Sequence, residues 1–98
     1  MGIVMQDSDM DKHAIKVLLS DTRILIIRLL KERKMMATEL VSIIGIRKNS
    51  ICKHLKMLRK AGYVERVKDN KHKWVYYQLT EKGMAMITSR QTYFNIIL

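Results

Sequence analysis

The sequence predicts a small, mainly helical α+β domain in which four helices, a two-stranded hairpin and a closing helix follow one another. Two observations carry this prediction. Apolar residues recur at helical spacing in the helical segments. A later segment, residues 64–79, is instead rich in β-branched and aromatic side chains around a turn-rich centre. The chain has 98 residues, which fits one domain, and we expect that domain to cover residues 8–98.

The first two helices follow a flexible tail, residues 1–7. The first helix is predicted from Asp11 to Leu19. Ser20 is expected to cap a second helix, which runs from Asp21 to about Lys34. Its apolar residues cover most of the circumference, so we expect this second helix to lie centrally and to contact several neighbours.

A third and a fourth helix come next, joined by a tight turn. Thr38 precedes the short third helix, which ends near Ile44, and Gly45 suits the sharp turn after it. The fourth helix is expected from about Lys48 to Ala61, where Gly62 can stop it. Two short helices joined by a glycine turn are typical of a helix-turn-helix.

A hairpin and a last helix complete the chain. The hairpin is predicted as a strand, a turn and a second strand, residues 64–68, 69–72 and 73–79. Trp74 and Tyr76 share one face of the second strand and are expected to pin the hairpin to the body, with a stacking platform for single-stranded nucleic acid as the alternative. The last helix is predicted from Glu81 to about Ile97. A hairpin directly after a helix-turn-helix is the wing of a winged helix-turn-helix fold.

The charge of the chain is strongly positive and unevenly placed. Lys plus Arg number 19 and Asp plus Glu number 9, so the formal net charge is +10. DNA, RNA and anionic lipid would all attract such a chain. Residues 47–73 hold ten of the positive and two of the negative side chains, a net +8. A solvated surface normally mixes both signs, so this concentration on the fourth helix and the hairpin favours a polyanion-binding face.

The fourth helix is predicted to be amphipathic. Ile51, Leu55 and Leu58 stack on one side, with basic residues opposite. Such a helix fits the DNA major groove, where Asn pairs with adenine, Lys donates to guanine, and residues further along reach phosphates. The predicted contacts of this helix are Arg47, Lys48, Asn49, Ser50, Lys53, Lys56 and Lys60. The alternative is an ordinary solvated helix face.

The hairpin is predicted to add contacts to phosphates or to an adjacent minor groove. These contacts are Arg66, Lys68, Asn70, Lys71, His72 and Lys73. Binding of this kind releases counterions, so it should weaken steeply as salt rises.

Several segments together resemble a known family. Leu19–Leu30 resembles the second helix of the ArsR-type winged-helix repressors, and Ile51–Val64, with its His-Leu, Leu, Ala-Gly and Val positions, resembles their helix-turn-helix. Val75–Leu79 is similar to their outgoing wing strand. Leu79–Gly83 also resembles the segment after the wing in MarR- and PadR-like regulators. The resemblance implies a homodimer that binds a partly palindromic site on double-stranded DNA and usually represses.

The same resemblance bears on cofactors. Metal-sensing members of that family carry cysteine pairs in the third helix, or Asp and His ligands on the last helix. Residues 38–44 contain no cysteine and residues 81–98 contain neither Asp nor His, so we expect no metal and no cofactor. Cys52 is expected to be a half-buried structural thiol, with a redox sensor as the alternative. His54 is expected to pack at the edge of the apolar face with a backbone partner. No nucleophile–base pair is evident, so we expect no enzyme.

The last helix carries a broad apolar face up to the end of the chain. A body this small covers only part of such a face, and large exposed apolar patches usually mark interfaces. Pairing with a second copy, alongside the first helix, would bury it in a twofold dimer, whereas the alternative is that it folds back on its own domain. The expected interface residues are Ile15, Leu18, Met84, Ile87, Phe94, Ile97 and Leu98.

These observations predict a sequence-specific, double-stranded DNA-binding transcriptional regulator. Residues 1–10 do not form a signal peptide, and no stretch approaches the roughly 18 apolar residues of a membrane span, so we expect a cytoplasmic protein without a membrane partner. Two rivals stay open. One is a winged helix that coats DNA without sequence preference or binds RNA, and the other is a winged helix that docks on a protein.

Overall fold

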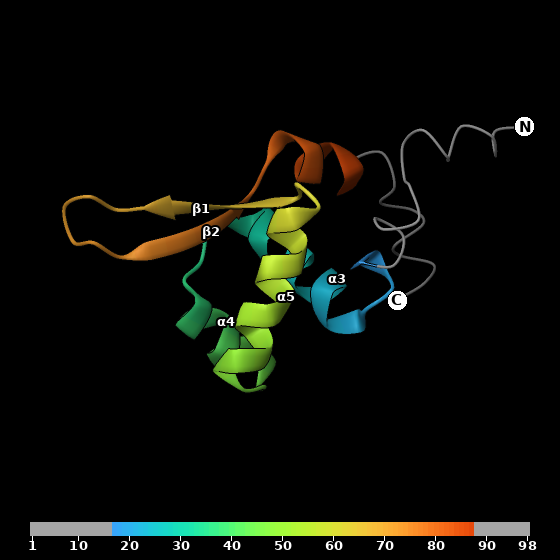
Figure 1. The fold of residues 1–98 in the computed structure, drawn as a ribbon, viewed down its shortest axis with the longest axis horizontal. Coiled ribbons are helices and arrows are strands. Elements are labelled where there is room, and N and C mark those ends of the chain that lie inside the picture. The colour runs from blue at the N-terminus through green and yellow to red at the C-terminus, as the bar shows by residue number, and fades with distance from the viewer. Residues whose placement is uncertain (1–16, 88–98) are drawn as a thin grey trace, which may run out of the picture.

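The computed structural model describes residues 17–87 of the chain. Its named elements are α3 (Asp21–Glu32), α4 (Ala37–Ile44), α5 (Lys48–Lys60), β1 (Val64–Lys68) and β2 (Val75–Leu79). Residues 17–18 and 81–87 are also helical. Figure 1 shows the helices gathered in one body, from which the hairpin of β1 and β2 projects to the left.

This order confirms the predicted α+β winged helix-turn-helix fold. The described part lacks most of the first predicted helix and the second half of the last one, because residues 1–16 and 88–98 lie outside it. The predicted tail at residues 1–7 therefore lies outside the described residues, as do Ile15, Phe94, Ile97 and Leu98.

The second predicted helix, α3, ends two residues earlier than expected. Ser20 caps its start as predicted, since the Ser20 hydroxyl accepts from the Arg23 amide at 3.3 Å. At the other end Arg33 is extended. The extended chain lets Met35 exchange two backbone hydrogen bonds with Tyr77 of β2, at 3.0 and 2.7 Å. This pairing across the fold ends the helix before Lys34.

The predicted start of α4 was two residues late. The cap is Met36 rather than Thr38, and Thr38 lies in the first turn. The Glu39 carboxylate accepts from the Met36 amide at 2.9 Å, and Arg33 donates to its other oxygen at 2.9 Å. Gly45 ends the helix in the left-handed region, with φ of 83°, as the sequence predicted.

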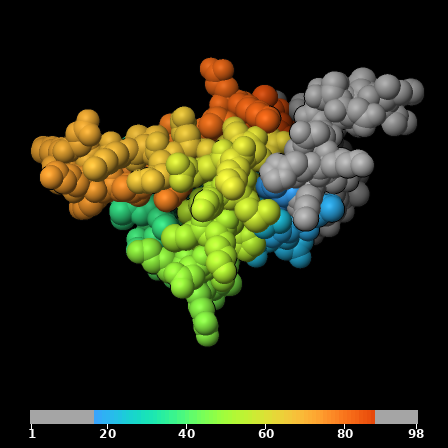
Figure 2. Space-filling model, viewed as in Figure 1, coloured from blue at the N-terminus to red at the C-terminus, as the bar shows by residue number. Residues whose placement is uncertain are grey.

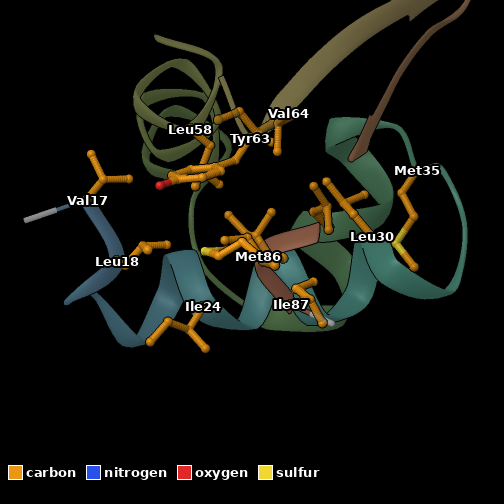
Figure 3. Packing of buried hydrophobic residues seen from close by; sticks show 14 of the residues in the cluster. Val17, Leu18, Ile24, Leu30, Met35, Leu58, Tyr63, Val64, Met86 and Ile87 are labelled. Atoms are coloured by element: carbon orange, nitrogen blue, oxygen red, sulfur yellow. The ribbon is translucent and has the colours of Figure 1, made fainter. Parts of the chain in front are cut away.

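The core is built from every described helix and from the base of the hairpin (Figure 3). As expected of a central helix, α3 buries four side chains, Ile24, Ile26, Ile27 and Leu30. Leu18 and Ile87 are 7% and 4% exposed and belong to this core. Both side chains are buried within the single chain, and their place at a dimer interface stays a prediction. Met84 is 40% exposed, and its place at that interface stays a prediction.

The hairpin is antiparallel, with Val64 opposite Leu79 at its base and Lys68 opposite Val75 near its tip. The second strand begins two residues later than predicted, because Lys73 adopts a left-handed φ of 61° inside the connecting loop.

The aromatic residues of β2 are placed differently from the prediction. Trp74 is 50% exposed and does not pin the hairpin to the body. Tyr77 does so instead, through its pairing with Met35 and its packing against the core. Tyr76 lies half-buried on the opposite face, where the Lys34 ammonium sits 4.7 Å from its ring centroid. Side chains alternate along the strand as predicted, but the face that meets the core is that of Tyr77 and not that of Trp74 and Tyr76.

The turn after β2 ties the last helix to the end of α5. Thr80 donates its hydroxyl to the Gly62 carbonyl at 2.6 Å. Lys82 donates to the Ala61 carbonyl at 2.9 Å, and its ammonium lies 5.0 Å from the Tyr63 ring centroid. A cation beside the carbonyl end of a helix is favourable, so Lys82 stabilises α5 where it ends.

Replacing Gly83 with Ala tests this close packing. An added Cβ would stand 2.3 Å from the Tyr63 carbonyl oxygen, so backbone would have to move. Glycine to alanine inside a helix normally stabilises by about 0.5–1 kcal/mol. We expect Gly83→Ala to lower the free energy of unfolding instead, by about 1–3 kcal/mol. Urea denaturation measures it, with Ala85→Gly on the same helix as the reference for helix propensity. A Gly83→Ala protein as stable as the wild type would contradict the contact.

Candidate nucleic-acid interface

The packing of α5 confirms the predicted amphipathic helix. Ile51, Leu55 and Leu58 are at most 1% exposed and fix the inner side of the helix. The outer side carries exposed polar and basic residues, which are Asn49, Lys53, Lys56, Arg59 and Lys60. Ser50 is half-buried. The surface of α5 runs through the centre of the face drawn in Figure 2.

The first turn of α5 is suited to an anion. Arg47 occupies the cap position, but its side chain makes no capping hydrogen bond, and no acidic residue lies in the first turn. The partial positive charge at this end of the helix is therefore not neutralised from within the first turn. Arg47 and Lys48 are both exposed beside it. A phosphate would meet helix amides and two cations together.

The loop of the hairpin, residues 69–74, is organised by Asp69. Its carboxylate accepts from the Lys71 amide at 2.9 Å and from His72 Nδ1 at 3.0 Å. Its own amide donates to the Trp74 carbonyl at 2.7 Å. The bonds to the carboxylate, with that from His72 the strongest cause, lower the pKa of Asp69 below its usual range. The negative charge is thus engaged inside the loop.

The predicted hairpin contacts are all exposed, namely Arg66, Lys68, Asn70, Lys71, His72 and Lys73. Arg66 and Lys68 lie on one face of the hairpin, because alternate residues of a strand point the same way. Glu65 lies on the other face, where Gln78 donates to its carboxylate at 2.8 Å. Arg66 and Lys68 therefore lie on the opposite face of the hairpin from Glu65, the only acidic residue in its two strands.

Lys34 lies beside the hairpin, on the face of Glu65 and Tyr76, which sequence reasoning did not predict. It lies far from residues 47–73 in the chain, yet its ammonium sits over Tyr76 on the hairpin. Its positive charge also contributes to the lowered pKa of Asp69. Only the folding of the segment after α3 against β2 brings this cation to the hairpin, and no local pattern signals it.

Two residues of α5 differ from expectation. Cys52 is exposed rather than half-buried, because the residue after Ile51 turns about 100° away from the core. His54 is half-buried as expected, but its partner is a side chain. Arg23 of α3 donates to His54 Nδ1 at 3.0 Å and to the Met57 sulfur at 3.3 Å.

The contact with Arg23 fixes the state of His54. A guanidinium has only donors, so Nδ1 must accept and the imidazole is neutral, with its proton on Nε2. Burial, and then the charge of Arg23, lower the pKa of His54 below its ordinary value of 6.5. The contact joins α3 to α5 on the side of α5 that faces the body.

The stability of the protein should therefore depend on pH through His54. Because its pKa is lower in the folded chain, the unfolded chain binds the proton first as pH falls. This contribution is complete above pH 6.5 and is lost as pH drops from 6.5 towards the folded-state pKa. His54→Gln keeps an acceptor for Arg23 but does not titrate. We expect its unfolding free energy, from denaturant titrations, to decline less between about pH 7 and 5. Parallel profiles for both proteins would refute this.

The described residues, 17–87, contain neither a candidate metal site nor a candidate membrane-spanning helix. No group of three His, Cys, Asp or Glu side chains there is placed to hold a metal ion. No helix within that range is long and apolar enough to cross a membrane.

Comparison with known proteins shows which family and which solved structures the chain is similar to. Residues 20–66 match the family described as bacterial regulatory protein, arsR family. No curated protein sequence matches the chain. Among solved structures, the transcriptional repressor BigR from Xylella fastidiosa is 29% identical, with a TM-score of 0.71 over 84% of this chain and 80% of its own. The reduced transcriptional regulator YodB from B. subtilis is also 29% identical, with a TM-score of 0.72 over 86% and 80%.

A more distant structure shares the fold alone. A mutant form of ZitR from Lactococcus lactis is 20% identical, with a TM-score of 0.69, and the match covers 80% of this chain. The chain spans only 54% of that protein's length. The matched family segment begins at the Ser20 cap of α3 and runs through α4 and α5 into β1. Residues 20–66, just under half of the chain, thus match the ArsR-family model in the helix-turn-helix of a winged-helix fold, and this likeness supports a DNA-binding transcriptional regulator.

Proposed function

We propose that this regulator is a repressor that places α5 in the major groove of its operator and the hairpin against the flanking DNA. One observation carries the proposal. The outer side of α5 and the hairpin expose nearly all of the cations of residues 47–73, whereas Glu65 and Asp69, the two acids there, are bonded to neighbouring side chains. A polyanion approaching this face would meet little negative charge.

The role that we propose for each residue of α5 depends on how far it lies from the start of the helix. Asn49 and Lys53 are exposed within the first two turns, and residues near the start of a recognition helix usually reach base edges. Lys56 and Lys60 lie one and two turns further on and are assigned to phosphates. Ser50 is half-buried, which leaves it a smaller part in base contact than Asn49.

Repression and dimerisation are part of the same proposal. The 29% identity to a transcriptional repressor supports repression, which would follow if the bound protein occludes a promoter. Met84 is the described member of the expected interface that stays exposed, and it supports pairing of two copies through the last helix. A twofold dimer would set two copies of α5 about 34 Å apart, one turn of DNA.

A charge-matched pair of double variants tests the placement of α5. Lys56→Gln with Lys60→Gln removes two proposed phosphate contacts. Arg28→Gln with Lys31→Gln removes two charges from α3. The first pair should weaken binding and make the slope of log affinity against log salt shallower by roughly 2. The second pair should leave the slope nearly unchanged. Fluorescence anisotropy of a labelled duplex over a salt series gives both. Equal effects of the two pairs would remove α5 from the interface.

Asn49→Ala tests sequence reading separately from affinity. The operator is first selected from a random duplex pool, which also reports whether the site is palindromic. We expect Asn49→Ala to lose about 1–3 kcal/mol of discrimination at one base pair of each half-site, because an amide pairs bidentately with adenine. Its binding to random duplex should not change. A wild-type protein that selects no site at all would favour the DNA-coating alternative instead.

A further inference from the structure

The free end of the hairpin carries an aromatic pair that the function proposed above does not use. Trp74, the only tryptophan of the chain, is 50% exposed. Its ring stacks on His72, with centroids 4.8 Å apart and planes inclined by 25°. An indole is normally placed where its apolar area is removed from water. Here it stands at the tip of a projecting hairpin, which Figure 1 shows extending away from the body.

The loop holds this pair in place. The Asp69 carboxylate accepts from His72 Nδ1 at 3.0 Å, and the Asp69 amide donates to the Trp74 carbonyl at 2.7 Å. Lys73, which lies between His72 and Trp74 in the sequence, takes a left-handed φ of 61°, a conformation that is costly for residues other than glycine. Backbone in such a conformation tends to accompany function. The loop thus keeps the two rings exposed even though the backbone of Lys73 is in an unfavourable conformation.

The surroundings of the rings indicate what they bind. Lys71 and Lys73 are exposed on either side of His72, so the partner joins apolar surface to negative charge. The minor groove of DNA does so, because its walls are deoxyribose and its edges are phosphates. Side chains that enter it are often apolar wedges accompanied by cations.

The length of the hairpin fits the same partner. Strands of five residues extend about 17 Å. The spacing from a major groove to the next minor groove is about half of a 34 Å turn, roughly 17 Å. A hairpin of this length can therefore span from a major groove that holds α5 to the adjacent minor groove.

We propose that Trp74, stacked on His72, packs into the minor groove beside the half-site and adds affinity and a flanking A·T preference. This inference rests on the proposed function, because it needs α5 in the neighbouring major groove. The preference follows from the groove itself, since G·C pairs place an amino group on its floor and A·T pairs do not.

The lone tryptophan makes its own burial measurable. The full chain is titrated with the selected operator duplex while Trp74 emission, its quenching by acrylamide and the anisotropy of the labelled duplex are followed. We expect emission to change and acrylamide quenching to fall with the same midpoint as the anisotropy. Binding by anisotropy with unchanged emission and quenching would overturn the inference and leave the proposed function intact. Absence of any binding would instead refute the proposed function.

Substitutions separate the ring from the charges around it. Trp74→Ala should weaken operator binding on the order of tenfold, by analogy with the loss of an aromatic that stacks on a base. Trp74→Phe should keep most of the affinity. Neither Trp74 substitution should change the slope of log affinity against log salt, whereas Lys71→Gln should make that slope shallower by about 1. Wild-type affinity in Trp74→Ala would overturn the inference. Urea denaturation checks that both variants are folded, which half-exposure of the side chain favours.

A duplex variant decides whether the contact is in the minor groove. Flanking G·C pairs are replaced with inosine–cytosine pairs, which keep the major-groove edge but lack the minor-groove amino group. The wild-type protein should bind the inosine duplex more tightly than the G·C duplex, and Trp74→Ala should bind the two alike. The same preference in both proteins would show that Trp74 does not approach the groove floor.

Discussion

Burial of Ile51, Leu55 and Leu58 sets the rotation of α5, and the candidate interface depends on that rotation. Because these three side chains are at most 1% exposed, the helix cannot turn about its axis without bringing apolar surface into water. The lysines of the opposite side are therefore held outward by the packing of a different set of residues. Lys82, bonded to the Ala61 carbonyl, and Thr80, bonded to Gly62, hold the far end of the helix.

The positive charge of the candidate interface depends on where its acidic residues lie as well as on its exposed cations. The chain exposes many cations, but the interface is defined by how its few acids are used. Glu65 is turned to the other face of the hairpin and bonded to Gln78. Asp69 organises the loop through His72. Each acid thus has a local structural role, and the field in front of α5 remains positive.

The inner side of α5 also bears a polar contact. Arg23 reaches from α3 to His54 and Met57, and it donates to the backbone carbonyl of Val17. One side chain therefore links the segment before α3, α3 itself and α5.

The sequence alone determined the order of elements, the amphipathic fourth helix and the clustering of charge, because each is a local pattern of period, capping and turn residues. Tertiary structure decided which face of β2 meets the core and where α3 ends, since both depend on Met35 pairing with Tyr77 across the fold. It also brought Lys34 to the hairpin and left Trp74 exposed. Contacts between distant segments depend on how whole elements pack, and no local window of sequence contains that information.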